Sequence, residues 1–142
     1  MRKVLVLNGP NLDKLGTREP GVYGASTLAD IERACVEFGQ ANGLDVDFRQ
    51  SNDEAQIITW LHEAASDKLP IIFNPAAFTH YSVAIRDAAA MCDGPIIEVH
   101  LSNPIAREEF RHTSLISGLA KGTISGFGAN SYILGLRALL EI

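Results

Sequence analysis

The chain has 142 residues, of which 46% are hydrophobic and 20% are charged, and its formal net charge at pH 7 is -5. This length suits a single domain, residues 1–142, with a buried core, and the composition excludes an intrinsically disordered protein. The negative charge, with no run of lysine or arginine, argues against a nucleic-acid partner and against binding at a membrane surface.

The amino-terminal residues carry no recognisable targeting signal. The apolar run after Lys3 breaks at Asn8 and Gly9, so it is too short for the hydrophobic region of a signal peptide or for a membrane span. Cys35 and Cys92 fall inside predicted helices, and neither has a partner at the spacing of a metal or redox motif. We therefore expect a cytoplasmic protein with two buried, reduced thiols.

Strand and helix patterns alternate along the chain. Short apolar or alternating runs predict strands at residues 3–7, 44–50, 70–74, 95–101 and 122–126. Helical spacing and capping residues predict helices at about 27–42, 51–66, 82–91, 104–110 and 131–142, the fourth of them short. Residues 8–26 form a long connection, rich in glycine and proline, that follows neither period.

Repeated strand–helix units imply a parallel sheet with helices on both faces, because each crossover must be right-handed and must cover the sheet. Five strands suit a flavodoxin-like α/β fold, a three-layer sandwich with a five-stranded parallel sheet in the order 2-1-3-4-5. In such sheets, ligands bind beyond the carboxyl ends of the strands. We therefore expect the functional site at that edge.

Polar and titratable side chains gather where these strands end. The set comprises Asn8, Asn11, Arg18, Tyr23, Asn74, His80, Glu98, His100, Ser102, Asn103, Arg107 and Arg111. At the opposite edge the sequence offers mainly lysines, which are typical of an ordinary solvated surface: Lys3, Lys68 and Lys121. This asymmetry is the main evidence for a site that comes from the residues alone.

Familiar nucleotide, hydrolase and metal motifs do not occur at this edge. No G-x-G-x-x-G or P-loop sequence follows the first strand, and no G-x-S-x-G is present. His62 does not begin an H-E-x-x-H motif, and His80 and His100 lack companions at metal-ligand spacing, so no metal is expected. A phospho-acceptor site needs an acidic residue where the third strand ends, and Asn74 stands there. Acid–base chemistry remains.

His100 is the natural proton donor of the set, since histidine ionises closest to neutral pH. Glu98 points to the same side of its strand, so it could orient the imidazole and keep it charged. Tyr23 and Arg18 lie in the same long connection. A guanidinium beside a phenol favours the phenolate, so Tyr23 could act as a base that Arg18 activates. Each residue also has a purely structural interpretation: His100 as a core histidine, Tyr23 as a surface tyrosine and Arg18 as a solvated charge.

Four segments of the chain resemble successive signatures of the type II 3-dehydroquinate dehydratases: NGPNLDKLGTREPGVYG, FRQSNDEAQIITWLHEA, NPAAFTHYSVAIRDA and IEVHLSNPIAREEFR. They occur in order between about Lys3 and Leu140. The resemblance implies anti elimination of water from 3-dehydroquinate to 3-dehydroshikimate through an enolate, in the shikimate pathway or in quinate catabolism. It implies no metal and no organic cofactor.

The resemblance also implies catalytic roles for individual residues. Tyr23 would remove the C2 proton of the substrate, and Arg18 would activate it. Asn11 would hold a water molecule against the developing enolate oxygen. His100, supported by Glu98, would protonate the departing C1 hydroxyl.

For substrate binding, the resemblance implies a carboxylate pocket made by Asn74, by Ser102 and by the backbone amides of Leu101 and Ser102. The ring hydroxyls would meet His80 and Arg111, and Asp87 would reach in from a neighbouring subunit. Arg107 would lie near the loop that carries Tyr23, although a surface salt bridge is its alternative. The family assembles as a homododecamer of trimers, which is the oligomer the resemblance implies here.

Two features qualify the resemblance. Tyr81 stands where many relatives have a small polar residue, which leaves the shape of the pocket undecided. Only Lys14 lies near the predicted site, so the Schiff-base chemistry of the unrelated type I enzymes is not expected. A non-catalytic flavodoxin-like module that binds FMN and an inactive structural oligomer are the competing classes of function.

Overall fold

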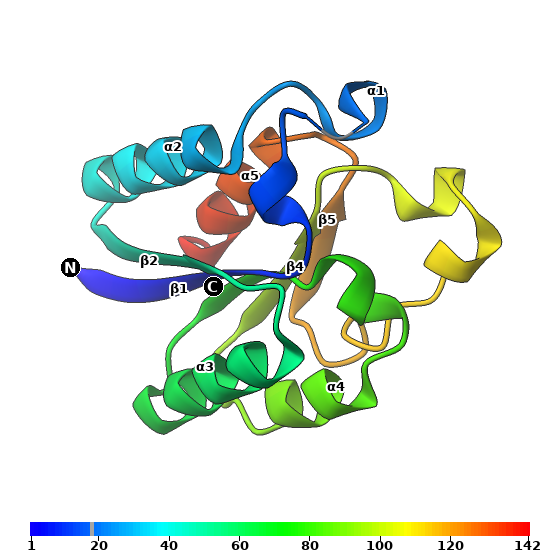
Figure 1. Cartoon of the computed structure of the whole chain (residues 1–142). Helices are drawn as coiled ribbons and strands as arrows, with labels where there is room; N and C mark the ends of the chain where they lie inside the picture. Colours follow the sequence, from blue (N-terminus) through cyan, green and yellow to red (C-terminus); the bar gives the residue numbers. More distant parts are fainter. Residues whose placement is uncertain (18) are drawn as a thin grey trace.

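The computed structural model of the chain describes residues 1–17 and 19–142, and it is built around one parallel sheet (Figure 1). The strands run in the spatial order β2-β1-β3-β4-β5, which confirms the order predicted from the sequence. Their bounds are β1 (Arg2–Asn8), β2 (Leu44–Gln50), β3 (Ile71–Asn74), β4 (Ile96–His100) and β5 (Gly122–Ser125).

Helices cover both faces of the sheet and complete the three-layer sandwich (Figure 1). On one face lie α2 (Leu28–Ala41) and α5 (Asn130–Leu139), and on the other lie α3 (Glu54–Asp67) and α4 (Val83–Ala90). The sequence marks where they begin, because Thr27 and Asp30 form a capping box before α2, and Asp53 and Ser82 cap α3 and α4.

The position of β1 between two layers of helices explains why its sequence is an unbroken apolar run. Val4 and Val6 pack into the cluster under α2 and α5, whereas Leu5 and Leu7 pack into the cluster under α3 and α4. All four side chains are buried. A strand covered on both faces needs apolar residues at successive positions, so the alternation typical of a half-exposed strand disappears.

Three local predictions were wrong. The helix predicted at 104–110 is two separate 3₁₀ turns, Pro104–Ala106 and Glu109–Arg111, because the backbone at Arg107 is extended (φ −116°, ψ −162°). The long connection contains a short helix, α1 (Pro20–Tyr23), as well as a 3₁₀ turn. Cys92 lies beyond the end of α4 and is only partly buried.

The two cysteines are free, as the sequence predicted. Burial raises the pKa of the Cys35 thiol to about 12, so this side chain stays protonated and packs as a small apolar group. Among the helices that the structure describes, none combines the length and the apolar character needed to cross a membrane.

Candidate active site

A pocket opens at the carboxyl ends of β1, β3 and β4, the edge at which the sequence places a site. Most of the predicted site residues line it, together with neighbouring apolar and proline residues. The lining comprises Pro10, Asn11, Leu12, Tyr23, Asn74, Ala76, Ala77, His80, His100, Leu101, Ser102, Pro104, Arg107 and Arg111.

Three predicted site residues stand apart from this lining. Glu98 is buried behind His100 and reaches a second, adjoining pocket that His80, His100 and Arg111 also line. Asp87 lies on α4 with its side chain 63% exposed, beside Arg86, and it is not among the described residues that line the first pocket. Arg18 lies outside the residues that the structure describes.

Tyr23 is held in the pocket by Arg107, which comes from the opposite side. The Nη2 atom of Arg107 donates a hydrogen bond to the Tyr23 hydroxyl at 2.9 Å, and Nη1 donates to Ser102 Oγ at 3.1 Å. The guanidinium carbon also lies 5.0 Å from the centre of the tyrosine ring. The structure thus places a cation against this phenol. The backbone at Arg107 is extended in the conformation that makes these contacts.

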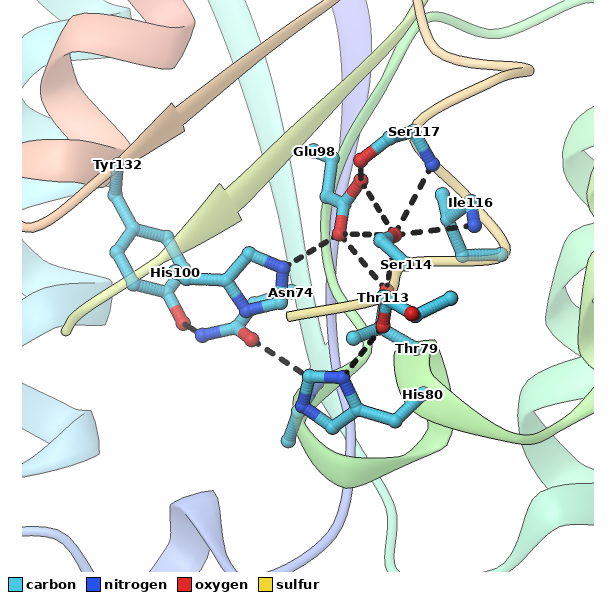
Figure 2. A network of polar contacts seen from close by, with 11 residues as sticks. Asn74, Thr79, His80, Glu98, His100, Thr113, Ser114, Ile116, Ser117 and Tyr132 are labelled. Atoms are coloured by element: carbon cyan, nitrogen blue, oxygen red, sulfur yellow. Dashed lines mark hydrogen bonds and ion pairs between the residues drawn. The ribbon is translucent and has the colours of Figure 1, made fainter. Parts of the chain in front are cut away.

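His100 is oriented by Glu98, as the alternation along β4 predicted. The His100 Nε2 atom lies 2.5 Å from Glu98 Oε2, and the carboxylate is 1% exposed (Figure 2). Burial alone would raise the pKa of Glu98, but the hydrogen bond and charge of His100, with the Ser117 and Thr79 hydroxyls, lower it to about 2. Glu98 is therefore an anion at neutral pH.

His80 is fixed by a backbone carbonyl. Its Nδ1 atom lies 2.8 Å from the carbonyl oxygen of Thr113 (Figure 2). A carbonyl oxygen only accepts hydrogen bonds, so Nδ1 carries the hydrogen and Nε2 is left as the nitrogen with a lone pair in the neutral ring. His80 therefore offers an acceptor for a hydroxyl group of a ligand.

Asn74 belongs to a second buried network, on the other side of His100 in Figure 2. Its Nδ2 atom donates to the Tyr132 hydroxyl at 2.9 Å, and its Oδ1 atom accepts from the Ala76 amide at 3.0 Å. The Tyr132 hydroxyl in turn donates to Asn8 Oδ1 at 2.6 Å. Burial raises the pKa of Tyr132 above its ordinary value, which keeps this donor protonated. One Nδ2 hydrogen of Asn74 remains for a ligand.

The sequence did not identify several residues that hold this site. They share a hydroxyl group and act behind the pocket: Thr79, Ser114, Ser117 and Tyr132. Serine and threonine are common in loops, so their presence in a sequence carries no signal that distinguishes them. A buried tyrosine on a helix reads as a core residue, and only its position under Asn8 and Asn74 reveals a polar role.

The described residues include no cluster of three histidine, cysteine, aspartate or glutamate side chains that could hold a metal ion. The site instead brings together a phenol beside a guanidinium, an imidazole on a buried carboxylate, and amide and hydroxyl groups. Such a set can move protons and can bind a small polyhydroxylated anion through neutral donors.

Known proteins match this chain over nearly all of its length. The family model for dehydroquinase class II matches residues 2–140. A 3-dehydroquinate dehydratase of Rhizobium meliloti (strain 1021) is 57% identical over 98% of this chain and 94% of its own length. The same enzyme of Halalkalibacterium halodurans is 52% identical over 99% and 97%.

Solved structures agree with the sequence matches. The type II dehydroquinase of Propionibacterium acnes superposes with a TM-score of 0.98 at 47% identity, covering 100% of this chain and 98% of that one. The enzyme from Butyrivibrio crossotus gives a TM-score of 0.95 at 41% identity, covering 98% and 97%. The chain therefore belongs to the class II dehydroquinase family.

Proposed function

We propose that this chain is a hydro-lyase that converts 3-dehydroquinate to 3-dehydroshikimate. The observation that carries the proposal is the pairing, in one pocket, of a phenol contacted by a guanidinium with an imidazole held by a buried carboxylate. An elimination needs a general base for the proton beside the ketone and a general acid for the departing hydroxyl. Family membership supports the same reaction.

Tyr23, as phenolate, removes the C2 proton of the substrate, and the C3 ketone becomes an enolate. The Arg107 guanidinium at 2.9 Å stabilises the phenolate oxygen, and Arg18 is proposed to act beside it. Asn11 holds a water molecule against the enolate oxygen. The backbone at Asn11 is in the left-handed region (φ 69°), and its amide is tied to Asn52 at 2.9 Å, which fixes where the loop turns.

His100 then supplies the proton for the leaving group. Because the anionic Glu98 carboxylate only accepts, His100 Nε2 donates to it, and Nδ1 is the nitrogen that can deliver a proton to the C1 hydroxyl. The C1–O bond breaks, water leaves, and the enolate electrons form the C1–C2 double bond. Tyr23 ends as the phenol and His100 as the neutral imidazole. Before the next turnover, Tyr23 must lose a proton and His100 must gain one, and solvent carries this exchange.

Neutral donors hold the carboxylate of the substrate. The remaining Nδ2 hydrogen of Asn74, the Ser102 hydroxyl and the amides of Leu101 and Ser102 bind its carboxylate, which suits a chain of net charge -5. His80 and Arg111 bind the ring hydroxyls. Asp87 is largely exposed and does not line the first pocket in the isolated chain, so we propose that it completes the pocket of a neighbouring copy in a dodecamer of trimers.

The test is a direct assay with purified protein and 3-dehydroquinate, followed by the ultraviolet absorbance of the conjugated product. A parallel protein sample is first treated with sodium borohydride in the presence of substrate and is freed of the reagent before the assay. We expect absorbance to rise equally in both samples, because no Schiff base forms. The Tyr23→Phe variant should bind the substrate but turn it over about 10²–10⁴-fold more slowly. No rise with folded wild-type protein would refute the proposed activity, and unchanged turnover in Tyr23→Phe would remove the tyrosine from the base role.

A further inference from the structure

The Glu98 carboxylate is enclosed by three hydroxyl groups (Figure 2). Thr79 Oγ1 lies 2.8 Å from Oε2, and Ser117 Oγ lies 2.6 Å from Oε1. Ser114 Oγ lies 3.0 Å from Oε1 and 2.8 Å from Oε2, so it bridges the two oxygens. Two of the three hydroxyls come from one short segment, Ser114–Ser117, which leads towards β5.

Counting hydrogens fixes the direction of these bonds. Ser114 Oγ accepts hydrogen bonds from the backbone amides of Ile116 and Ser117, each at 3.1 Å. Both lone pairs of this hydroxyl are then occupied, so Ser114 is the donor in its contacts with the two Glu98 oxygens. Thr79 Oγ1 is 2.8 Å from Ser114 Oγ as well, but Ser114 has no lone pair left for it, so Thr79 also donates to Glu98.

This arrangement leaves Glu98 with acceptor roles alone. Ser114, Thr79 and Ser117 all donate to the carboxylate, and a protonated carboxyl would find no acceptor among them without breaking one of these bonds. Because Glu98 is an anion at neutral pH, His100 Nε2 carries the hydrogen of their contact. The ring is thereby held in one tautomer and in one orientation, with Nδ1 available to a ligand.

The segment is itself anchored to the core. Ile116 is fully buried in the cluster under α3 and α4, and the Leu115 amide donates to the Thr79 carbonyl at 2.7 Å. The same region supplies the Thr113 carbonyl that holds His80. Two histidines of the pocket therefore depend on residues 113–117, none of which lines that pocket among the described residues.

We propose that Ser114 and Ser117 are positioning residues for His100, acting through Glu98. The inference deepens the proposed function and rests on it for the identity of the reaction. The two serines do not line the first pocket; they line the adjoining pocket that Glu98 also reaches. They keep the carboxylate ionised and correctly placed, so that His100 presents Nδ1 as its reactive nitrogen.

The test combines kinetics with a measurement that needs no activity. We would prepare Ser114→Ala, Ser117→Ala and the double variant, with Ser117→Thr to restore a hydroxyl. Ser66→Ala is the matched control, since this serine is exposed near the end of α3, at the opposite edge of the sheet. Nitrogen-15 spectra of the histidine rings report which nitrogen carries the hydrogen, and loss of a signal in His100→Asn identifies His100.

In the wild type, we expect neutral His100 to carry its hydrogen on Nε2. In Ser117→Ala and the double variant, the His100 signal should change towards a mixture of tautomers, and kcat should fall about tenfold, less than for loss of the acid itself. KM should change by less than about twofold, because substrate contacts are intact. Ser117→Thr should restore both readouts.

Unchanged tautomer and unchanged kcat in the double variant would overturn the inference. An equal loss in Ser66→Ala would overturn it as well, because the effect would then not be local. If Ser114→Ala does not fold, Ser117→Ala decides the question, since the Ser117 hydroxyl donates to Glu98 and, among the described residues, caps no backbone group. A wild-type protein that is inactive on 3-dehydroquinate would refute the proposed function, while the ring spectra would still decide the positioning role.

Discussion

At the scale of single residues, the contact between Arg107 and Tyr23 joins positions 84 residues apart. Arg107 uses two guanidinium nitrogens at once, one for Tyr23 and one for Ser102. A lysine carries a single ammonium group and cannot reproduce this planar fork. We therefore predict that Arg107→Lys lowers kcat by about tenfold although the positive charge is kept.

Steady-state kinetics of dehydration at pH 7 would check this prediction. Arg33→Lys is the matched control, because Arg33 is an exposed arginine on α2 that pairs with Asp30 at 3.2 Å and does not line the pocket. That variant should keep its kcat. Equal kcat values for wild type and Arg107→Lys would mean that the charge alone matters, or that the contact is not used during turnover.

The sequence predicted the side chains that line the pocket better than the side chains that lie behind it. Tyr23 and His100 stand out because few residue types perform acid–base chemistry at neutral pH, and Glu98 follows from the alternation of a strand. Ser114 and Thr79 meet Glu98 only through folding, and no local pattern brings positions 16 and 19 residues away into contact. Long-range polar contacts therefore need the structure.

At the scale of elements, the ends of β1 and β3 approach so closely that Gly9 tolerates no side chain. A Cβ atom at Gly9 would lie 2.2 Å from the carbonyl oxygen of Pro75, and the Gly9 amide donates to the Asn74 carbonyl at 2.8 Å. Backbone would have to move to admit a methyl group. We predict that Gly9→Ala lowers the free energy of unfolding by about 1–3 kcal/mol and raises KM, because it shifts Asn74.

Urea unfolding and substrate kinetics would measure the two effects. Gly122→Ala is the control, since a Cβ atom at Gly122 meets nothing within 4 Å. This variant should keep both stability and KM close to the wild-type values. A Gly9→Ala protein as stable as the Gly122→Ala protein would show that the β1 and β3 ends can separate at little cost.

The elements were predictable where burial dictates the pattern. β1 and β3 are covered on both faces, so their apolar runs have few other interpretations, and the helix caps at Thr27 and Ser82 act locally. The segment 104–110 has a proline start and a helix-like composition, but Arg107 takes an extended conformation there. In this conformation Arg107 contacts Tyr23 and Ser102. These are tertiary contacts, and helix propensity within the segment does not predict them.

At the scale of the whole molecule, Glu98 should make stability depend on pH. Its pKa is about 2 in the folded chain against an ordinary value of 4.5, so the folded state binds fewer protons than the unfolded state between these values. The stabilisation is therefore fully present above pH 4.5 and is lost as the pH falls towards 2. We predict that urea midpoints of the wild type decline through this window.

Glu98→Gln separates this effect from general acid unfolding. The variant should be less stable at pH 7 by about 1–3 kcal/mol, and its midpoint should decline less steeply between pH 4.5 and 2 than that of the wild type. Glu141→Gln, at an exposed carboxylate after α5, should keep the wild-type slope. Parallel slopes for Glu98→Gln and the wild type would mean that other carboxylates control acid unfolding.

The surface around α4 allows the assembly of the chain to be tested. Large apolar side chains are exposed on and beside α4, where Tyr81 is 62% exposed, Val83 60% and Met91 61%, and Asp87 extends from the same helix. Large exposed apolar side chains are common on surfaces that another protein covers. If a second copy covers the surface around α4, a charge at Val83 should disrupt the oligomer.

We therefore predict that Val83→Asp converts the proposed dodecamer into smaller species, counted by native mass spectrometry, because burying an unpaired carboxylate is costly. Turnover should fall in parallel, since Asp87 would no longer reach a neighbouring pocket, whereas Ala34→Asp on the exposed side of α2 should change neither. Dissociated Val83→Asp protein with full turnover would show that each chain has a complete site of its own. An intact dodecamer would place the contact elsewhere on the surface.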